Sequence, residues 1–265
     1  MVAVKTYTTA LAKGHGIIPE TLILLNTWEP GITPVELANR AVHEGLLGKA
    51  TANRVHDVVK KVFAPRYLVD SGNPAKNLKE LLNSGLTPVN LQQLFLLYTA
   101  RANAVLHDFI VQVYWPKYAS GQQVLSTSDA LAFLESAYAQ GKLPKKWNEN
   151  MTARIANGLC GCLADFGLLE KKKKSTRIIT PIQIASLTSL YLAYELHFSG
   201  YSDDSILVQP DWQLFGLQPG LEVVRELQRV AKDYFIVQFS GELMRISWKY
   251  QTMEEALHVL ARAEF

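Results

Sequence analysis

Apolar residues recur mostly at helical spacing along this chain. Thr33, Pro34 and Glu36 supply an N-cap, a proline at the first helical position and a capping-box acid, which predict a helix to about Glu44. After the glycine-bounded turn GLLGK, apolar residues of TANRVHDVVKKVF fall on one helix face, at Val55, Val58, Val59, Val62 and Phe63. Helix, tight turn and helix predict a helix-turn-helix in the first part of the chain.

The middle of the chain predicts one long buried helix. The segment SGNPAKN, at 71–77, is typical of a loop because it combines Gly, Asn and Pro. Thr87 and Pro88 then open an almost continuously apolar stretch, which we expect to form one helix through about Tyr114 and to end before Pro116. This helix is the expected scaffold for the flanking modules.

A second helix-turn-helix is predicted next, followed by a β-hairpin. Ser128 is the expected N-cap of a helix to about Gln140, and the basic turn GKLPKKW leads to a helix from about Asn148 to Asp165. Its expected buried face is Met151, Ile155, Leu159, Leu163 and Phe166, and its expected exposed face is Asn150, Arg154, Asn157 and Gly161. Gly167–Glu170 and Thr176–Thr180 predict the two strands of the hairpin, whose tip is KKKKS. The whole arrangement is that of a winged helix.

The last third predicts a small α+β module. We expect a helix from about Gln218 to Lys232, strands YFIVQFS and LMRISWKY joined by a turn at Gly241-Glu242, and a closing helix from Met253 to Ala263. The predicted fold class is therefore mainly α with small β-hairpins, with helix-turn-helix and winged-helix modules packed around a central helix. The predicted domains are an N-terminal helix-turn-helix (1–75), a helical scaffold (76–125), a winged helix (126–182) and the α+β module (183–265).

Charge is distributed unevenly along the chain. The net charge is only +3, but residues 142–180 carry +6 and residues 181–265 carry −5. The basic segment is a candidate for phosphate contacts, whereas the acidic one is a poor surface for DNA and a better candidate for a protein contact.

Two surfaces are candidates for binding double-stranded DNA. The main one is the second helix-turn-helix and its wing, with phosphate contacts expected from Lys142, Lys145, Lys146, Arg154, Lys171, Lys172, Lys173, Lys174 and Arg177, and groove contacts from Asn150 and Asn157. The other is the first helix-turn-helix, with Thr51, Asn53, Arg54, Lys60 and Lys61, although Asp57 lies among them. The alternative for the lysine run is a solvated hairpin tip without a ligand. Lysine carries no base code, so weak sequence selectivity is expected.

The sequence does not indicate an enzyme, a cofactor or a metal site. The six histidines have no metal-ligand spacing, and the small residues of Cys160-Gly-Cys162 predict a packing face. GLLGKAT has His43 where a phosphate loop needs its first glycine. Two cysteines too close together to join distant segments, no signal peptide and no apolar run of about 20 residues predict a cytoplasmic protein outside the membrane.

Four segments resemble the BrxA proteins of bacterial BREX phage-defence systems. They are YTTALAKGHGIIPETLILLNTW, AVHEGLLGKATANRVHDVVKKVFAPRYL, LQQLFLLYTARANAVLHDFIVQVYWPKY and KWNENMTARIANGLCGCLADFGLLEKKKKSTRIITP. The resemblance covers about the first 180 to 200 residues. It implies a small cytoplasmic, non-enzymatic protein that binds double-stranded DNA through helix-turn-helix or winged-helix modules, beside the other BREX subunits.

Two other functions stay open at this point. The winged modules can instead bind protein, which would make the chain an assembly adaptor without direct DNA contact, with its acidic C-terminal third as the surface for other BREX subunits. Binding of single-stranded or structured RNA is less well supported, because aromatic residues are not interleaved with the lysine run.

Overall fold

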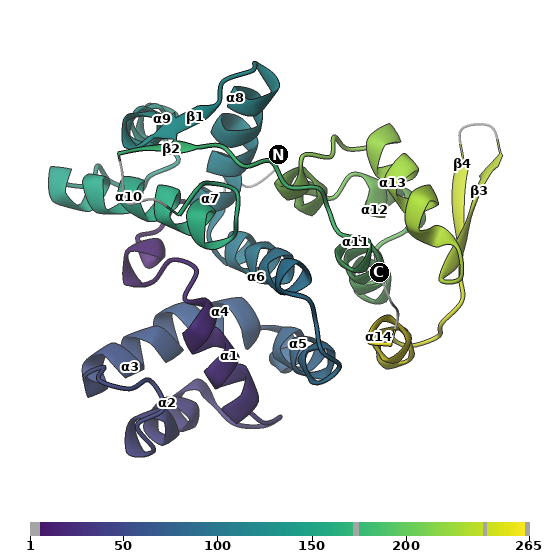
Figure 1. Ribbon diagram of the computed structural model, residues 1–265, viewed down its shortest axis with the longest axis horizontal. Coiled ribbons are helices and arrows are strands. Elements are labelled where there is room, and N and C mark those ends of the chain that lie inside the picture. The colour runs from purple at the N-terminus through teal and green to yellow at the C-terminus, as the bar shows by residue number, and fades with distance from the viewer. Residues whose placement is uncertain (1–5, 172–174, 241–242, 263–265) are drawn as a thin grey trace. The chain divides into compact units, whose positions relative to one another are not determined.

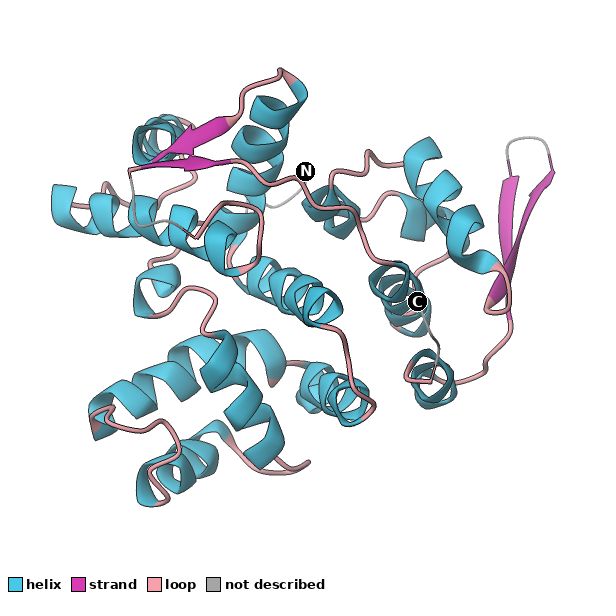
Figure 2. Ribbon diagram, in the orientation of Figure 1, coloured by secondary structure: helices cyan, strands magenta, loops and turns pink. Residues whose placement is uncertain are grey.

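The computed structural model describes residues 6–171, 175–240 and 243–262. These residues are mainly helical with two small antiparallel β-sheets, which confirms the predicted class of a mainly α protein with small β elements (Figure 1; Figure 2). The chain forms two compact units. The first unit comprises residues 1–76 and 95–182, and the second comprises residues 77–94 and 183–265.

The first unit begins with the predicted helix-turn-helix. After η1 (Ala10–Lys13) and α1 (Ile18–Thr27), the pair consists of α2 (Pro34–His43) and α3 (Ala52–Val58). Thr33 N donates to Glu36 Oε2 at 2.8 Å and Glu36 N donates to Thr33 Oγ1 at 3.2 Å, so the capping box is confirmed. The second helix continues through a π-helical turn, η2 (Val59–Phe63), into α4 (Ala64–Tyr67), and the predicted apolar face is buried.

The predicted loop at 71–77 is wrong. A short 3-10 helix, η3 (Asp70–Gly72), is followed directly by α5 (Asn73–Asn83). Pro74 lies in the first turn of α5, where a missing N–H costs no intrahelical hydrogen bond, so the proline begins a helix here and does not mark a loop.

The single long helix is also wrong, because the chain bends by 113° at Asn103. The apolar stretch forms α6 (Pro88–Ala102) and then a continuous segment of α7 (Ala104–Phe109), η4 (Ile110–Tyr114) and α8 (Trp115–Ala119). Asn103 leaves the helical region, with φ −136° and ψ 88°, and its side chain donates to Thr99 O at 2.8 Å. An asparagine amide that binds its own backbone competes with the helix in this way. Among the described residues, no single helix is long and apolar enough to span a membrane, and these two segments qualify only together, across the bend.

The second helix-turn-helix is present, but its sheet is built differently from the prediction. The order is β1 (Val124–Ser126), α9 (Thr127–Ala139), α10 (Glu149–Asp165) and β2 (Thr176–Ile178), with β1 antiparallel to β2. Gly167–Glu170, the predicted first strand of the hairpin, contacts β2 at its end. Glu170 N donates to Ile178 O at 3.0 Å, and Leu169 forms an isolated β-bridge with Ile179. This order fits a winged helix. The N-cap of α9 is Ser126, which forms a capping box with Asp129, and not the predicted Ser128.

The second unit contains the predicted α+β elements around a buried helix. That helix is α11 (Ser186–Phe198), followed by α12 (Asp203–Leu207) and η5 (Pro210–Phe215). The predicted helices and strands are α13 (Leu221–Ala231), β3 (Phe235–Ser240), β4 (Leu243–Trp248) and α14 (Met253–Leu260), with β3 antiparallel to β4. The predicted turn at 241–242 lies outside the described residues. The Tyr194 ring packs on Trp248 and Phe235, with centroid distances of 5.1 and 6.0 Å.

Candidate nucleic-acid interface

The first half of α10 and the turn before it present the predicted polar and basic residues to solvent. Asn148 Oδ1 accepts from Met151 N at 2.8 Å and so fixes the start of the helix. The exposed residues of this region include Lys145, Lys146, Asn150, Arg154 and Asn157. Ile155, Leu159, Leu163 and Phe166 are buried on the opposite face, as predicted, while Met151 is half-buried. This region is the basic α10 surface, defined by Lys145, Lys146 and Arg154.

The second half of α10 packs against the N-terminal segment. A Cβ at Gly161 would lie 3.5 Å from the His15 ring, and one at Gly158 would lie 3.6 Å from it. Gly16 N donates to Asp165 Oδ2 at 3.0 Å. The prediction that Gly161 lies on an exposed face is therefore wrong, because that side of the helix packs against residues 11–16.

The cysteines lie in the same part of α10 and are buried. Cys160 is 3% exposed and Cys162 is 0% exposed. Burial raises the pKa of the Cys160 thiol to about 11 and that of Cys162 to about 12. Both side chains therefore occupy the core as neutral thiols at pH 7.

Lys142 does not share the exposure of the neighbouring lysines. Its Nζ lies 2.7 Å from Asp108 Oδ2, its side chain is 19% exposed, and its carbonyl accepts from Tyr7 N at 2.9 Å. The Tyr7 hydroxyl also donates to Asp108, at 2.6 Å. We therefore remove Lys142 from the candidate contacts, because this ammonium holds the N-terminal segment against α7.

The same cluster predicts a pH dependence of stability. Burial acts to raise the pKa of Asp108, but hydrogen bonds from His107, Lys142 and Tyr7 outweigh it and hold this pKa well below its usual range. Replacing Asp108 with Asn is expected to reduce the free energy of unfolding at pH 7 by roughly 2 kcal/mol. The carboxylate stabilises the fold fully above the unfolded pKa of about 3.9 and loses its effect as pH falls through the lower folded value. Urea unfolding should therefore show the full difference at pH 7 and a smaller one at pH 2, where the unfolded carboxyl is protonated while the folded one is still largely ionised; an equal difference at both pH values would contradict this account.

The wing contributes Lys171 and Arg177 to the described structure. Lys171 is exposed, and Lys172, Lys173 and Lys174 lie outside the described residues. Arg177, on β2, is half-buried, and its Nε is buried without a hydrogen-bond partner among the described groups. The charge of Arg177 also acts on His15, whose pKa is lowered. Burial is the largest cause of this lowering; Asp165 acts to raise the pKa, and the charges of Arg66, Arg54 and Arg177 lower it further. The positive charges of Arg177 on the wing and of Arg54 and Arg66 on the N-terminal helices thus act on the same histidine.

The first helix-turn-helix exposes its predicted contact residues, but several are held in local interactions. Thr51 Oγ1 accepts from Arg54 N at 3.3 Å as an N-cap, and the Arg54 guanidinium donates to Lys13 O. Lys61 and Lys13 lie 2.5 and 2.8 Å from the Asp57 carboxylate. Their hydrogen bonds lower the pKa of Asp57 to about 2, so this acid is ionised and offsets their charge. Asn53 and Lys60 are also exposed. This surface is therefore the less basic of the two.

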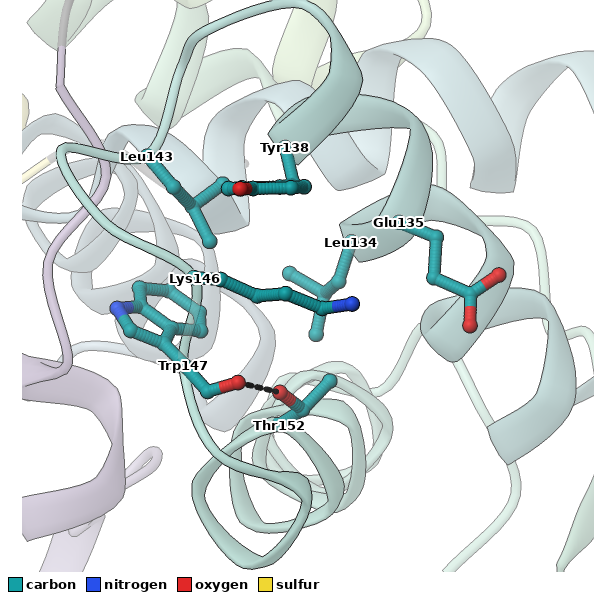
Figure 3. A pocket seen from close by; sticks show the side chains of 7 residues that line it. All are labelled: Leu134, Glu135, Tyr138, Leu143, Lys146, Trp147 and Thr152. Atoms are coloured by element: carbon teal, nitrogen blue, oxygen red, sulfur yellow. Dashed lines mark hydrogen bonds between the residues drawn. The ribbon is translucent and has the colours of Figure 1, made fainter.

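A pocket beside the basic turn was not predicted from the sequence. It has a volume of about 270 Å³ and lies between α9, the turn and the start of α10 (Figure 3). Its lining includes Tyr138, Lys146 and Trp147, and the Lys146 ammonium lies 5.7 Å from the centroid of the Tyr138 ring. The signal in the sequence is that Tyr138 lies three residues before the turn GKLPKKW and that Trp147 is the last residue of this turn.

The acidic charge of the second unit is partly used inside its fold. Asp203 accepts from Ile246 N and Trp248 Nε1 at 2.8 and 3.2 Å. Glu226 is 8% exposed and binds Ser189 and Arg229. The acidic surface is therefore smaller than the charge count of the sequence indicates.

These features define a mainly helical protein with two helix-turn-helix units in one compact body and exposed positive charge at the second. The BrxA family model matches residues 5–194, so the chain belongs to the BrxA family, as the resemblance indicated. Membership of this family makes it a component of a BREX phage-defence system.

Comparison with solved structures supports the fold. The crystal structure of an uncharacterized protein from Magnetospirillum magneticum is similar, with a TM-score of 0.58 and 15% sequence identity over 72% of this chain and 94% of the other. A comparison with curated protein sequences gives no match.

Proposed function

We propose that this protein is the non-enzymatic component of its BREX system that binds double-stranded DNA, with low sequence selectivity. The observation that carries the proposal is the basic α10 surface. Lys145, Lys146 and Arg154 are all exposed there, in one ten-residue stretch of the second helix-turn-helix. Helix-turn-helix proteins place the second helix of the pair at the groove and the surrounding basic groups on the phosphates.

The side chains in this region suit backbone contacts better than base readout. Lysine binds phosphate as a point charge and does not distinguish bases, and only Arg154 offers a bidentate fork on α10. Asn150 and Asn157 are exposed on the same helix and supply the groove contacts, although Asn157 Oδ1 also accepts from Thr127 Oγ1 at 3.4 Å. Selectivity is therefore expected to be small.

Salt dependence tests this proposal directly. Five described groups, Lys145, Lys146, Arg154, Lys171 and Arg177, would neutralise about one phosphate each, so log Kd should rise with log salt with a slope of roughly 4 to 5. Fluorescence anisotropy with a labelled duplex of about 30 base pairs measures this slope. Two duplexes of unrelated sequence should bind within a few-fold of each other. A slope near zero would falsify the mechanism.

An adaptor role is the second candidate, and exposed apolar residues of the second unit favour it. Val208, Leu221 and Ile236 are 59%, 62% and 59% exposed. Large apolar side chains that are exposed at the surface are available to a protein partner. Co-purification with the other BREX subunits, comparing the unmodified chain with Leu221→Ser/Ile236→Ser, should show loss of a partner with duplex affinity retained. An adaptor that makes no DNA contact would show partner binding and no anisotropy change at any salt concentration.

A further inference from the structure

The pocket beside the basic turn has a composition that the phosphate contacts do not explain. Its floor is apolar, since Leu134 and Leu143 are only 2% and 7% exposed. Two aromatic residues line it, Tyr138 from α9 and Trp147 from the end of the turn (Figure 3). Tyr138 is 44% exposed, so its ring is accessible from solvent. An accessible ring above an apolar floor is suited to a flat, mostly apolar ligand.

Charged groups stand at the rim of this pocket. The Lys146 ammonium lies 5.7 Å from the Tyr138 centroid, and Figure 3 shows it directed toward the same side of the pocket as the Glu135 carboxylate. A ligand that satisfies both groups carries an anionic part and a separate N–H donor. The pocket therefore combines three requirements, which are a planar ring, a negative charge and a hydrogen-bond donor.

We infer that the pocket receives one unpaired nucleobase of a DNA strand held on the basic α10 surface, an inference that rests on the proposed function. A nucleotide has a planar base, a phosphate for Lys146 and, on most bases, N–H donors for Glu135. The volume of about 270 Å³ is below the range of about 300–1,000 Å³ of drug-sized sites, which suits a single ring system. Stacking of a base on tyrosine or tryptophan tolerates any sequence.

Aromatic residues lie beside the basic turn and not beside the wing lysines. The sequence has no aromatic residue within the lysine run, which counts against binding of single-stranded or structured RNA at the wing. In the folded chain, Tyr138 and Trp147 instead accompany Lys146 of the turn, and the cation lies over the tyrosine ring. The aromatic and basic groups needed for a base platform are thus brought together in space.

Glu135 gives the pocket a preference among bases. Guanine presents two adjacent N–H donors on its Watson–Crick edge, which a carboxylate accepts with both oxygens. Thymine presents one N–H between two carbonyl oxygens, which a carboxylate repels. An unpaired guanine is therefore the preferred occupant and thymine the least preferred.

The test compares three labelled duplexes that are fully paired, carry one unpaired guanine, or carry one unpaired thymine. The unmodified protein should bind the guanine bulge about fivefold or more tightly than the paired duplex, and the thymine bulge with a smaller gain. Tyr138→Leu should lose the gain while its affinity for paired duplex is unchanged, and Tyr138→Phe should keep it. Tyr201→Leu, a change at a 42% exposed tyrosine of the second unit, is the matched control and should keep the gain.

The outcomes separate this inference from the DNA-binding proposal. Equal affinity for paired and bulged duplexes, or a gain that survives in Tyr138→Leu, overturns the base pocket while duplex binding stands. Equal affinity is also the result expected if the pocket holds a side chain of a protein partner. If no duplex binds, the proposed function fails, and quenching of tryptophan fluorescence by a guanine-containing trinucleotide tests the pocket alone. Quenching that does not depend on Tyr138 overturns it.

Discussion

Reversing the three charges of the basic α10 surface, Lys145→Glu, Lys146→Glu and Arg154→Glu together, is expected to weaken duplex binding by about 100-fold or more at low salt. Each charge reversal removes about one phosphate contact, so the slope of log Kd against log salt should fall by about 3. All three side chains are exposed, so the fold should tolerate the change. Fluorescence anisotropy over a salt series measures both quantities.

The control for this variant changes the net charge equally at another place. Arg225, Lys232 and Lys249 are exposed basic residues of the second unit, and their reversal to Glu should lower affinity far less. If both triple variants lose the same affinity, the effect is one of overall charge and not of the α10 surface. If neither loses affinity but reversal of Lys171, Lys172, Lys173 and Lys174 does, the contact lies on the wing alone.

Replacing Gly16 with Ala is expected to reduce the free energy of unfolding by roughly 1–3 kcal/mol. A Cβ at this position would lie 2.5 Å from Asp165 Cβ, and rotation of the aspartate cannot move its own Cβ away. The N-terminal segment must therefore shift away from α10 and stretch the hydrogen bond from Gly16 N to Asp165 Oδ2. Urea unfolding monitored by circular dichroism measures the change.

Gly161→Ala is the matched control on the other side of the same contact. Its Cβ would meet the His15 ring at 3.5 Å, which is ordinary van der Waals contact. Alanine also favours the helix by up to about 1 kcal/mol over glycine. This variant should be as stable as the unmodified protein or more stable, and equal destabilisation by both alanines would contradict the packing described here.

The sequence predicted those parts of the fold that local rules decide. Thr33 with Glu36 defined the start of α2, and Asn148 defined the start of α10, because an N-cap satisfies backbone donors within three residues of itself. Strand β1 was missed because three residues carry no periodicity. These residues form a strand because they pair with β2, which lies about 50 residues further along the chain.

The candidate site was less predictable, because distant partners decide which basic groups are free. Lys142 and Lys145 look alike in sequence, yet Lys142 is paired with Asp108, which lies 34 residues away. Gly161 continues the helical spacing of exposed Asn150 and Arg154, but a segment from the start of the chain covers it. Charge and periodicity describe what a helix face could meet, and only the tertiary fold decides what it does meet.

The hydrogen bond from Gly16 to Asp165 also bears on how the protein is made. It joins residues 149 positions apart, so on a translating ribosome the N-terminal segment emerges long before α10 exists to receive it. The first helix-turn-helix can form early from local contacts, whereas the apolar side of residues 11–16 waits for more than half of the chain to be synthesised. In the cell, this stretch therefore lacks its packing partner until α10 has emerged, and slower translation beyond α10 would give it time to close on that helix.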